Sequence, residues 1–323
     1  MRILANDGLE QAGINALEAH GFEVITKKVA QEHLEQFINE NAVSTLLVRS
    51  ATEVRQPLID ACPRLQIIGR GGVGMDNIDV EFARSKGIHV INTPSASSAS
   101  VAELVFAHLF SGARFLEDSN RKMPVSGETE FAALKKNYSK GIELRGKTIG
   151  IIGMGRIGQE VAKIALGLGM RVLAADNQVG TAAIKVKFYN NQYINVDIQT
   201  EPFEEVIRHS DFITLHVPAQ SDGTFIIGAE EFVKMKDGAA IINCSRGGVV
   251  DEDALIDALD SGKIRFAGLD VFINEPIPSR RVLAHPKISL TPHTGASTVE
   301  AQDRIGISLA EQISNILKVQ REN

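Results

Sequence analysis

The sequence predicts an α/β protein built from two doubly wound, parallel-sheet domains. Short apolar runs alternate with amphipathic runs of helix length through both halves of the chain. A glycine-rich turn of the form G-x-G-x-x-G lies near the middle, directly after an apolar run and directly before an amphipathic one. The chain has 323 residues, and at ~150 residues per domain this length predicts two domains.

In the first part of the chain, strands are predicted by the apolar runs "RILA", "FEVIT", "STLLV", "LQIIG" and "IHVIN", and connecting helices by segments such as "LEQAGINALEAHG". Parallel strands require such crossover connections, so the pattern indicates βαβ units. The stretch Asn92 to Ser100, "NTPSASSAS", interrupts the alternation with small polar residues and a proline. It predicts a hinge before an apolar helix from about Val101 to Leu116.

The second part of the chain begins with residues 120–146, which are polar, rich in lysine and weakly periodic, so we expect a surface loop or an arm there. The alternation resumes at Lys147. Between Asp176 and Glu201 apolar residues alternate around "NN", which predicts a short hairpin. The last segment carries an apolar stripe at helical spacing that must be buried against another element, and the stripe consists of Ile305, Leu309, Ile313 and Ile316.

The composition argues against several classes of function. The formal net charge of −6 and the pI near 5.8 provide no basic field for a polyanion, so we expect no nucleic-acid partner. Cys62 and Cys244 are far apart and outside metal-ligand spacing, so we expect neither a disulfide framework nor a metal site. The N-terminus lacks a signal-peptide pattern, and no apolar run approaches the ~18 residues of a membrane span. We therefore expect a cytoplasmic protein with no membrane partner.

The glycine-rich turn has the features of a dinucleotide site. Gly153 permits the tight turn, Gly155 lets the backbone approach a pyrophosphate, and Gly158 lets helix and strand pack closely. Asp176 ends the next strand about 20 residues later, where an acid accepts hydrogen bonds from the ribose hydroxyls and repels a 2′-phosphate. The alternative is a glycine-rich turn of an unrelated α/β protein, but strand, helix and acid occur together here. The pattern predicts NAD rather than NADP as the cofactor.

Three further residues each follow a predicted strand: Arg246 in "INCSRGGVVDEDAL", Glu275 in "AGLDVFINEP" and His293 in "SLTPHTGAST". Taken singly, they could be a surface arginine in a turn, a solvated loop acid and a structural histidine. Together they stand at the edge where open parallel sheets bind ligands. A histidine can hold a proton near neutral pH, an adjacent acid favours its imidazolium form, and a guanidinium grips a carboxylate through two parallel hydrogen bonds. The set fits hydride transfer at a carbon that bears a hydroxyl next to a carboxylate.

With these residues identified, the chain resembles the D-2-hydroxyacid dehydrogenase family, and within it the D-3-phosphoglycerate dehydrogenases. The similarity covers nearly the whole length and is carried in order by "LLVRSATEV", "IIGRGGVGMDNIDVEFARSKGIHVINTP", "SVAELVFAHLFSGAR", "LRGKTIGIIGMGRIGQEVA", "DFITLHVP", "INCSRGGVVDEDAL", "AGLDVFINEP" and "TPHTGAST". It implies a Rossmann NAD-binding domain inserted into a flavodoxin-like substrate-binding domain, with the active site in the cleft. The implied boundaries are 1–98 for the first part of the substrate domain, 99–290 for the NAD-binding domain and 291–323 for a C-terminal helix that returns to the substrate domain.

The resemblance also implies roles for individual residues. Arg246 would bind the substrate carboxylate and carbonyl, His293 would be the acid/base and Glu275 its partner. Beside the three glycines of the turn, the implied NAD contacts are Val73, Arg156, Ile157, Asp176, His216, Val217, Pro218, Cys244, Ser245, Asp270 and Gly295. The implied substrate contacts, including those to a phosphate, are Arg49, Ser50, Arg70, Gly72, Gly74 and Lys136.

Some stretches depart from the family pattern. Asn177 stands where the family usually has a proline, and the insertion 177–200 is longer than usual. The arm "LKKNYSKGIEL" lacks the family's tryptophan, and Lys136 stands in for an arginine that reaches the neighbouring subunit. We expect a homodimer through the NAD-binding domains, with Lys136 lending charge across the interface. The chain ends at Asn323 without the C-terminal regulatory domain of many phosphoglycerate dehydrogenases, so we expect no inhibition by L-serine.

Three functions stay open at this point. The first is NAD-dependent oxidation of D-3-phosphoglycerate to 3-phosphohydroxypyruvate in L-serine biosynthesis. The second is the same chemistry on a non-phosphorylated acid such as glyoxylate, hydroxypyruvate or D-lactate. The third is an NAD-sensing binding protein similar to the transcriptional corepressors that share this fold. The arginines of "VRSAT" and "IGRGG" favour the first, because a phosphate needs fixed cations.

Overall fold

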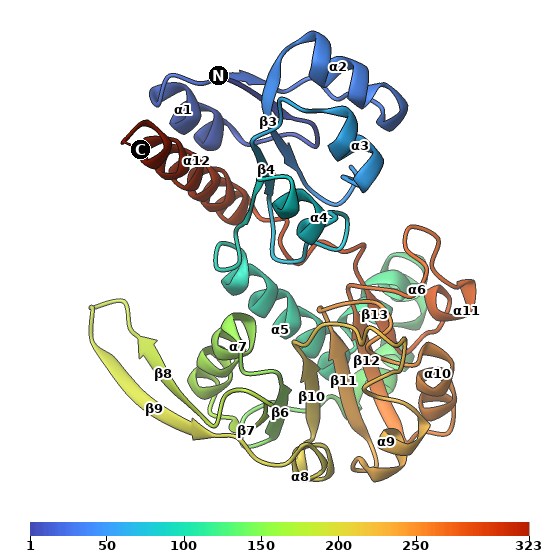
Figure 1. The fold of residues 1–323 in the computed structure, drawn as a ribbon. Helices are drawn as coiled ribbons and strands as arrows, with labels where there is room; N and C mark the ends of the chain where they lie inside the picture. Colours follow the sequence, from blue (N-terminus) through green and yellow to red (C-terminus); the bar gives the residue numbers. More distant parts are fainter. Residues whose placement is uncertain (323) are drawn as a thin grey trace. The chain divides into compact units, whose positions relative to one another are not determined.

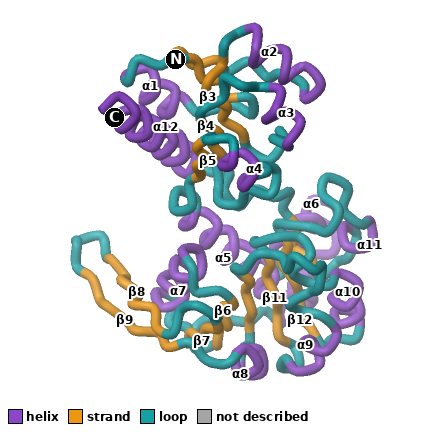
Figure 2. Tube along the Cα trace, viewed as in Figure 1, coloured by secondary structure: helices purple, strands orange, loops and turns teal. Residues whose placement is uncertain are grey.

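The computed structural model describes residues 1–322, and the chain forms two compact units. Unit 1 contains residues 1–98 and the segment from Ala296 onward, whereas unit 2 is Ala99–Gly295. Each unit is organised around a parallel sheet with helices on both faces (Figures 1 and 2).

Unit 1 has a five-stranded parallel sheet in the order β2-β1-β3-β4-β5, which is the flavodoxin-like order. Its strands are β1 (Arg2–Ala5), β2 (Glu23–Ile25), β3 (Val43–Val48), β4 (Ile67–Arg70) and β5 (His89–Asn92). One face packs against α1 (Gln11–Ala19) and α12 (Val299–Glu322), and the other against α2 (Leu34–Glu40), α3 (Gln56–Ala61) and α4 (Val80–Ser85). A short 3₁₀ helix, η1 (Gln31–His33), precedes α2.

Helix α12 packs against α1 and the face of the sheet beside it. Its apolar stripe is buried there, Ile316 less completely than Ile305, Leu309 and Ile313. The two helices cross at a pair of glycines, since a Cβ on Gly13 would lie 2.6 Å from the Cα of Gly306. Side chains at this crossing would push the helices apart. The C-terminal helix therefore completes the core of unit 1.

Unit 2 has a six-stranded parallel sheet in the order β13-β12-β11-β10-β6-β7. Its strands are β6 (Thr148–Ile152), β7 (Arg171–Ala175), β10 (Phe212–Leu215), β11 (Ala239–Asn243), β12 (Ile264–Leu269) and β13 (Ile288–Leu290). One face packs against α5 (Ser98–Arg114) and α7 (Arg156–Gly167), the other against α8 (Phe203–His209), α9 (Ala229–Lys234) and α10 (Glu252–Asp260). A short helix, α11 (Arg280–Leu283), precedes β13.

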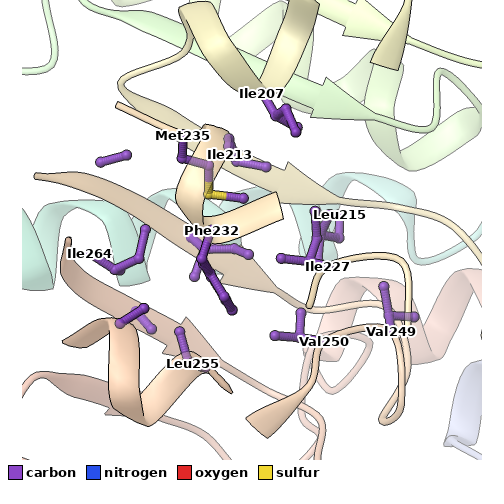
Figure 3. Packing of buried hydrophobic residues seen from close by; sticks show 14 of the residues in the cluster. Ile207, Ile213, Leu215, Ile227, Phe232, Met235, Val249, Val250, Leu255 and Ile264 are labelled. Carbon is purple, nitrogen blue, oxygen red and sulfur yellow. The ribbon is translucent and has the colours of Figure 1, made fainter. Parts of the chain in front are cut away.

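The second of these faces forms the core shown in Figure 3. Phe232 of α9 and Met235, just after that helix, lie among apolar side chains of the strands, including Ile213 and Leu215 of β10. Strand order reverses between β6 and β10, because β7 lies on one side of β6 and all later strands lie on the other. Such a switch point is where doubly wound sheets bind their ligands. The predicted fold class is confirmed.

The insertion after β7 forms the predicted hairpin. Strands β8 (Thr181–Lys187) and β9 (Tyr193–Gln199) pair antiparallel. Their inward side chains, Ala182, Ile184 and Ile198, are buried in the core shared with α7. The hairpin lies beside β7, where the outer strand lies in the order 3-2-1-4-5-6 of dinucleotide-binding domains. A bridge between Ala174 and Thr200 joins it to the sheet.

We expected a surface loop or an arm at residues 120–146, and the expectation of a loop was wrong for most of that segment. Helix α6 (Leu116–Asn137) and a 3₁₀ turn, η2 (Tyr138–Lys140), occupy it. Its polar sequence forms ion pairs at helical spacing, Glu117 with Arg121 at 2.6 Å and Asp118 with Lys122 at 3.0 Å. These pairs stabilise a helix that exposes most of its surface and therefore shows little apolar periodicity.

No single helix within residues 1–322 is long and apolar enough to cross a membrane, although the bent pair of α5 and α6, extended to Lys140, meets the criteria of length and composition when taken together. The same residues contain no group of three or more His, Cys, Asp or Glu side chains placed to hold a metal ion.

Candidate active site

The turn between β6 and α7 has the shape that a pyrophosphate requires. Gly153 has a φ of +99°, and a Cβ there would lie 2.5 Å from the carbonyl oxygen of His216. A Cβ on Gly158 would lie 2.0 Å from the carbonyl oxygen of Gly153, so helix and strand could not pack as they do. A Cβ on Gly155, in contrast, would meet no atom within 4 Å. Gly155 thus leaves open space at the N-terminus of α7 and, as the N-cap residue, provides no side chain to bond the first N–H groups of the helix.

Asp176 follows β7 and closes this turn. One of its carboxylate oxygens accepts the backbone N–H of Met154 at 2.7 Å, and the other accepts those of Gln178 and Val179 at 2.7 and 2.9 Å. Burial raises the pKa of Asp176, but the three N–H donors outweigh it and leave the pKa below its usual value. The carboxylate is therefore ionised at neutral pH, which fits ribose hydroxyls and opposes a 2′-phosphate.

Glu275 and His293 lie together at the same edge of the unit 2 sheet, after β12 and β13. Nδ1 of His293 is 2.8 Å from Oε2 of Glu275. The other carboxylate oxygen accepts the backbone N–H of Phe272 at 2.9 Å, which fixes the acid. The His293 backbone has a φ of +54°, a left-handed conformation that is uncommon for a non-glycine residue and is found at functional sites. Within residues 1–322 no side chain or backbone group hydrogen-bonds to Nε2, so this nitrogen is available to a ligand.

Arg246 lies in the loop after β11. Its Nη1 donates to the carbonyl oxygen of Ser245 at 2.7 Å, and its own carbonyl oxygen accepts Nδ2 of the buried Asn243 at 2.9 Å. The next residue brings this loop against the loop after β12, since a Cβ on Gly247 would lie 1.9 Å from the carbonyl oxygen of Phe272. Arg246 and the segment that carries Glu275 are therefore held on adjoining loops.

The other enclosed histidines of unit 2 do not suit proton transfer. Burial lowers the pKa of His216 to about 3, and its Nε2 lies 2.9 Å from the Thr214 hydroxyl. Burial also lowers the pKa of His108, against a smaller opposing effect of Asp270. Both rings stay neutral at physiological pH. His293, in contrast, has a carboxylate partner and a partly exposed ring at the ligand edge of the sheet, which makes it the acid/base candidate.

The remaining predicted NAD residues occupy the loops at this edge of unit 2, except for one. Arg156 and Ile157 begin α7, and the loops after β10 to β13 carry His216, Val217, Pro218, Cys244, Ser245, Asp270 and Gly295. Val73 instead lies in unit 1, in the loop after β4. Cys244 is buried, and burial raises the pKa of its thiol well above the usual value, so it stays neutral. Lys136 is exposed near the end of α6.

The predicted substrate residues of unit 1 follow two neighbouring strands. Arg49 and Ser50 come after β3, whereas Arg70 ends β4 and precedes Gly72 and Gly74. Arg49 Nη2 lies 3.6 Å from Oε1 of Glu10, and both side chains are substantially exposed, so this pair is weak. The Arg70 guanidinium lies against Gly72, where a Cβ would come within 1.9 Å of its Nη1.

Two anchors of the unit 1 loop were missed in the sequence. The Asp7 carboxylate accepts the backbone N–H groups of Arg49 and Thr52 at 2.7 and 3.1 Å. Burial raises the pKa of Asp7, but hydrogen bonds from Lys28, Thr52 and Arg49 outweigh it and lower the pKa overall. Asn77 Nδ2 donates to the carbonyl oxygens of Arg49 and Thr52. The signal for Asp7 was available, since an acid directly after a strand, in "RILAND", stands at the ligand edge of the sheet.

Comparisons with known proteins agree with this geometry. Residues 106–295 match the model of the D-isomer specific 2-hydroxyacid dehydrogenase NAD binding domain. The chain is 41% identical over 318 residues to a D-3-phosphoglycerate dehydrogenase of Methanocaldococcus jannaschii, covering 98% of this chain but 58% of that relative. It is 42% identical over 316 residues to a hydroxypyruvate reductase of Thermotoga maritima, covering 97% of both. A solved acyclic imino acid reductase, Bsp5, in complex with NADPH and D-Arg, superposes with a TM-score of 0.82 at 28% identity, covering 98% of this chain and 97% of that one.

The chain therefore belongs to the D-isomer specific 2-hydroxyacid dehydrogenase family, whose members are NAD-linked oxidoreductases. Its cofactor is NAD, and the open space at Gly155 with the ionised Asp176 fits that cofactor. The chain spans 58% of the length of the M. jannaschii relative and almost all of the T. maritima one.

Asp176 should control the choice of cofactor. We expect the wild type to prefer NADH to NADPH, and Asp176→Asn, which keeps one acceptor oxygen but removes the charge, to lose most of that preference. One charge-assisted hydrogen bond to the ribose contributes about 1.5–3 kcal/mol, so the NADH/NADPH ratio of kcat/KM should fall about tenfold or more. Asp222→Asn, in an exposed turn of unit 2, is the matched control and should leave the ratio unchanged. Equal wild-type rates with both cofactors would contradict the assignment.

Proposed function

We propose that the protein is an NAD-dependent dehydrogenase that oxidises D-3-phosphoglycerate to 3-phosphohydroxypyruvate, the reaction that opens L-serine biosynthesis. The observation that carries the proposal is the 2.8 Å pair of His293 and Glu275, which lies at the same edge of the unit 2 sheet as the NAD turn. A 41% identical relative bears the name of this activity.

Oxidation of the substrate removes a hydride from the carbon that bears the hydroxyl and a proton from the hydroxyl oxygen. NAD supplies the hydride acceptor. Nε2 of His293 takes the proton of the substrate hydroxyl, and the imidazolium so formed is stabilised through Nδ1 by Glu275. In the reverse direction the same nitrogen returns the proton to the carbonyl oxygen.

Arg246 holds the substrate in place for this step. Its guanidinium donates two parallel hydrogen bonds to the planar carboxylate, a geometry that lysine cannot reproduce. The backbone of Arg246 is fixed by Asn243, and its Nη1 by the carbonyl oxygen of Ser245. A substrate bound this way would have the carbon next to its carboxylate, which bears the hydroxyl, held in a fixed position.

The phosphate would be bound by Arg49 and Arg70 of unit 1. The weak pair of Arg49 with Glu10 leaves its guanidinium able to bind an anion. Asp7 and Asn77 hold the backbone of that loop, so the cation is presented from a fixed position. The contacts to the phosphate would therefore provide the binding free energy by which the enzyme prefers this substrate to its non-phosphorylated counterpart.

A second candidate is reduction of a non-phosphorylated 2-oxo acid. Examples are hydroxypyruvate, glyoxylate and pyruvate, and reduction of the last of these gives D-lactate. The T. maritima hydroxypyruvate reductase favours it, because the match covers 97% of both chains. A third candidate is an NAD-sensing protein without turnover, and a failure to reduce any of a panel of 2-oxo acids with NADH would favour it.

The catalytic and the anchoring residue should fail in different ways. His293→Ala should lower kcat by roughly 100-fold or more, the usual contribution of a general acid/base, with little change in KM. Arg246→Ala should raise KM and lower kcat together, since each lost charge-assisted bond costs about 1.5–3 kcal/mol. Steady-state kinetics with NADH and the best substrate measure both. Near-wild-type turnover in His293→Ala would refute the mechanism.

Substrate identity should follow from the phosphate. Two charge-assisted hydrogen bonds, each about 1.5–3 kcal/mol, should favour 3-phosphohydroxypyruvate over hydroxypyruvate at least a hundredfold in kcat/KM. Arg49→Ala should reduce that ratio about tenfold or more, whereas Arg64→Ala, an exposed arginine of unit 1, should not change it. A wild-type ratio near one would reject the phosphoglycerate assignment, and a large ratio that survives Arg49→Ala would place the phosphate elsewhere.

We also propose a homodimer through unit 2. Helix α6 exposes apolar side chains that a partner would cover, Met123 at 42%, Val125 at 84% and Phe131 at 58%. Sedimentation should give twice the 35.0 kDa of one chain. Phe131→Glu should shift the protein to the monomer, whereas Tyr189→Glu, at the exposed tip of the hairpin, should not. A wild-type monomer would overturn the proposal.

A further inference from the structure

Helix α5 carries a buried histidine that reaches the strand end preceding His293. His108 is 2% exposed. Its Nδ1 lies 2.9 Å from the Ser289 hydroxyl on β13, and its Nε2 lies 3.0 Å from the Thr291 hydroxyl just after that strand. Neither nitrogen contacts the residues assigned to chemistry, yet both contacts are made with the segment that leads to His293.

Close packing of α5 on β12 makes this reach possible. A Cβ on Gly268 of β12 would lie 2.6 Å from the Cβ of His108, so only glycine leaves room for the ring. One helical turn later the glycine is on the helix and the large side chain is on the strand, because a Cβ on Gly112 would lie 2.1 Å from the ring of Phe266. Large and small side chains thus alternate across the contact, and the imidazole is held over β12 with its edge toward β13.

The carboxylate of Asp270 determines which atoms donate and which accept in the hydrogen bonds of Thr291, His108 and Ser289. Thr291 Oγ1 lies 2.7 Å from Oδ1 of Asp270, and a carboxylate only accepts, so the threonine hydroxyl donates to it. The remaining contact of that hydroxyl must then be accepted from Nε2–H of His108, which makes Nδ1 the acceptor for Ser289. This arrangement needs a neutral ring, and burial lowers the pKa of His108.

Asp270 in turn holds the backbone around His293. It is 1% exposed, and its carboxylate accepts the N–H groups of Thr294 and Gly295 at 2.7 and 2.8 Å. Its carbonyl oxygen accepts the N–H of His293 at 2.8 Å. The left-handed backbone of His293 is therefore set by contacts to a residue whose carboxylate is bound, through Thr291, to His108.

We propose that His108 is a positioning residue, which acts through Thr291 and Asp270 to hold residues 291–295 so that His293 meets Glu275. It touches neither substrate nor cofactor. The inference rests on the proposed acid/base role of His293. An apolar residue of similar size would fill the same space over Gly268 but would leave the hydroxyls of Ser289 and Thr291 without their ring partner.

The experiment compares His108→Leu, which removes both ring nitrogens, with His108→Gln, whose side-chain amide offers a donor and an acceptor. Leu109→Ala, a neighbouring fully buried position of α5, is the control for lost packing. Because small misplacements of a reacting group can cost up to roughly 100-fold, His108→Leu should lower kcat about tenfold or more while KM changes little. His108→Gln should recover most of that loss, and Leu109→Ala should lower Tm but leave kcat within about twofold.

The second readout is the ring ¹⁵N–¹H spectrum of His293, which reports the Nδ1–H bond to Glu275 without any turnover. We expect the Nδ1–H signal in the wild type, His108→Gln and Leu109→Ala, and its loss or displacement in His108→Leu. A His108→Leu variant with unchanged kcat and an unchanged His293 signal, but a Tm lowered as in Leu109→Ala, would overturn the proposal. Should the wild type reduce no 2-oxo acid, the proposed function fails, and the His293 signal alone then decides whether His108 positions that ring.

Discussion

A carboxylate removed from water must find donors, and at Asp270 this constraint organises the catalytic edge of unit 2. The side chain is 1% exposed, and burying an ion without partners would cost several kcal/mol or more. Its donors come from the segment after the neighbouring strand, the hydroxyl of Thr291 and the N–H groups of Thr294 and Gly295. The position of His293 within that segment is thus a consequence of satisfying a buried charge.

The parallel sheet explains how residues far apart in the chain share one edge. All strands of the sheet run in the same direction. The loops that follow β6, β11, β12 and β13 therefore all lie at the edge formed by the carboxyl ends of the strands. Glycines then set the spacing between loops, as the close approach of Gly247 to Phe272 illustrates. The same topological rule places both the NAD turn at Gly153 and the pair of Glu275 and His293 that we propose for proton transfer.

The sequence was sufficient where a local pattern determines structure. Apolar periodicity predicted the strands and the stripe of α12, and the spacing of glycines with Asp176 predicted the NAD turn. It failed at α6, because that helix is stabilised by ion pairs such as Glu117 with Arg121 and shows little apolar period. His108 was missed for another reason. Its partner Thr291 lies far along the chain, and no local pattern specifies such a pair. Asp7 could have been noticed from its place just after β1, but its contact with the distant loop at Arg49 could not.

In the proposed function, chemistry and substrate specificity depend on different units of the molecule. The proposed acid/base pair and the NAD turn belong to unit 2. The chain is similar to both a D-3-phosphoglycerate dehydrogenase and a hydroxypyruvate reductase, and the proposed mechanism uses this pair for either substrate. The arginines that would distinguish a phosphate lie in unit 1, and Asp7 and Asn77 hold the loop that carries Arg49. Exchanging one such arginine changes the charge offered to the substrate while leaving the buried network around Asp270 intact. On this proposal the same edge of unit 2 would serve several 2-hydroxy acids, and the loops after β3 and β4 would determine which of them is the substrate.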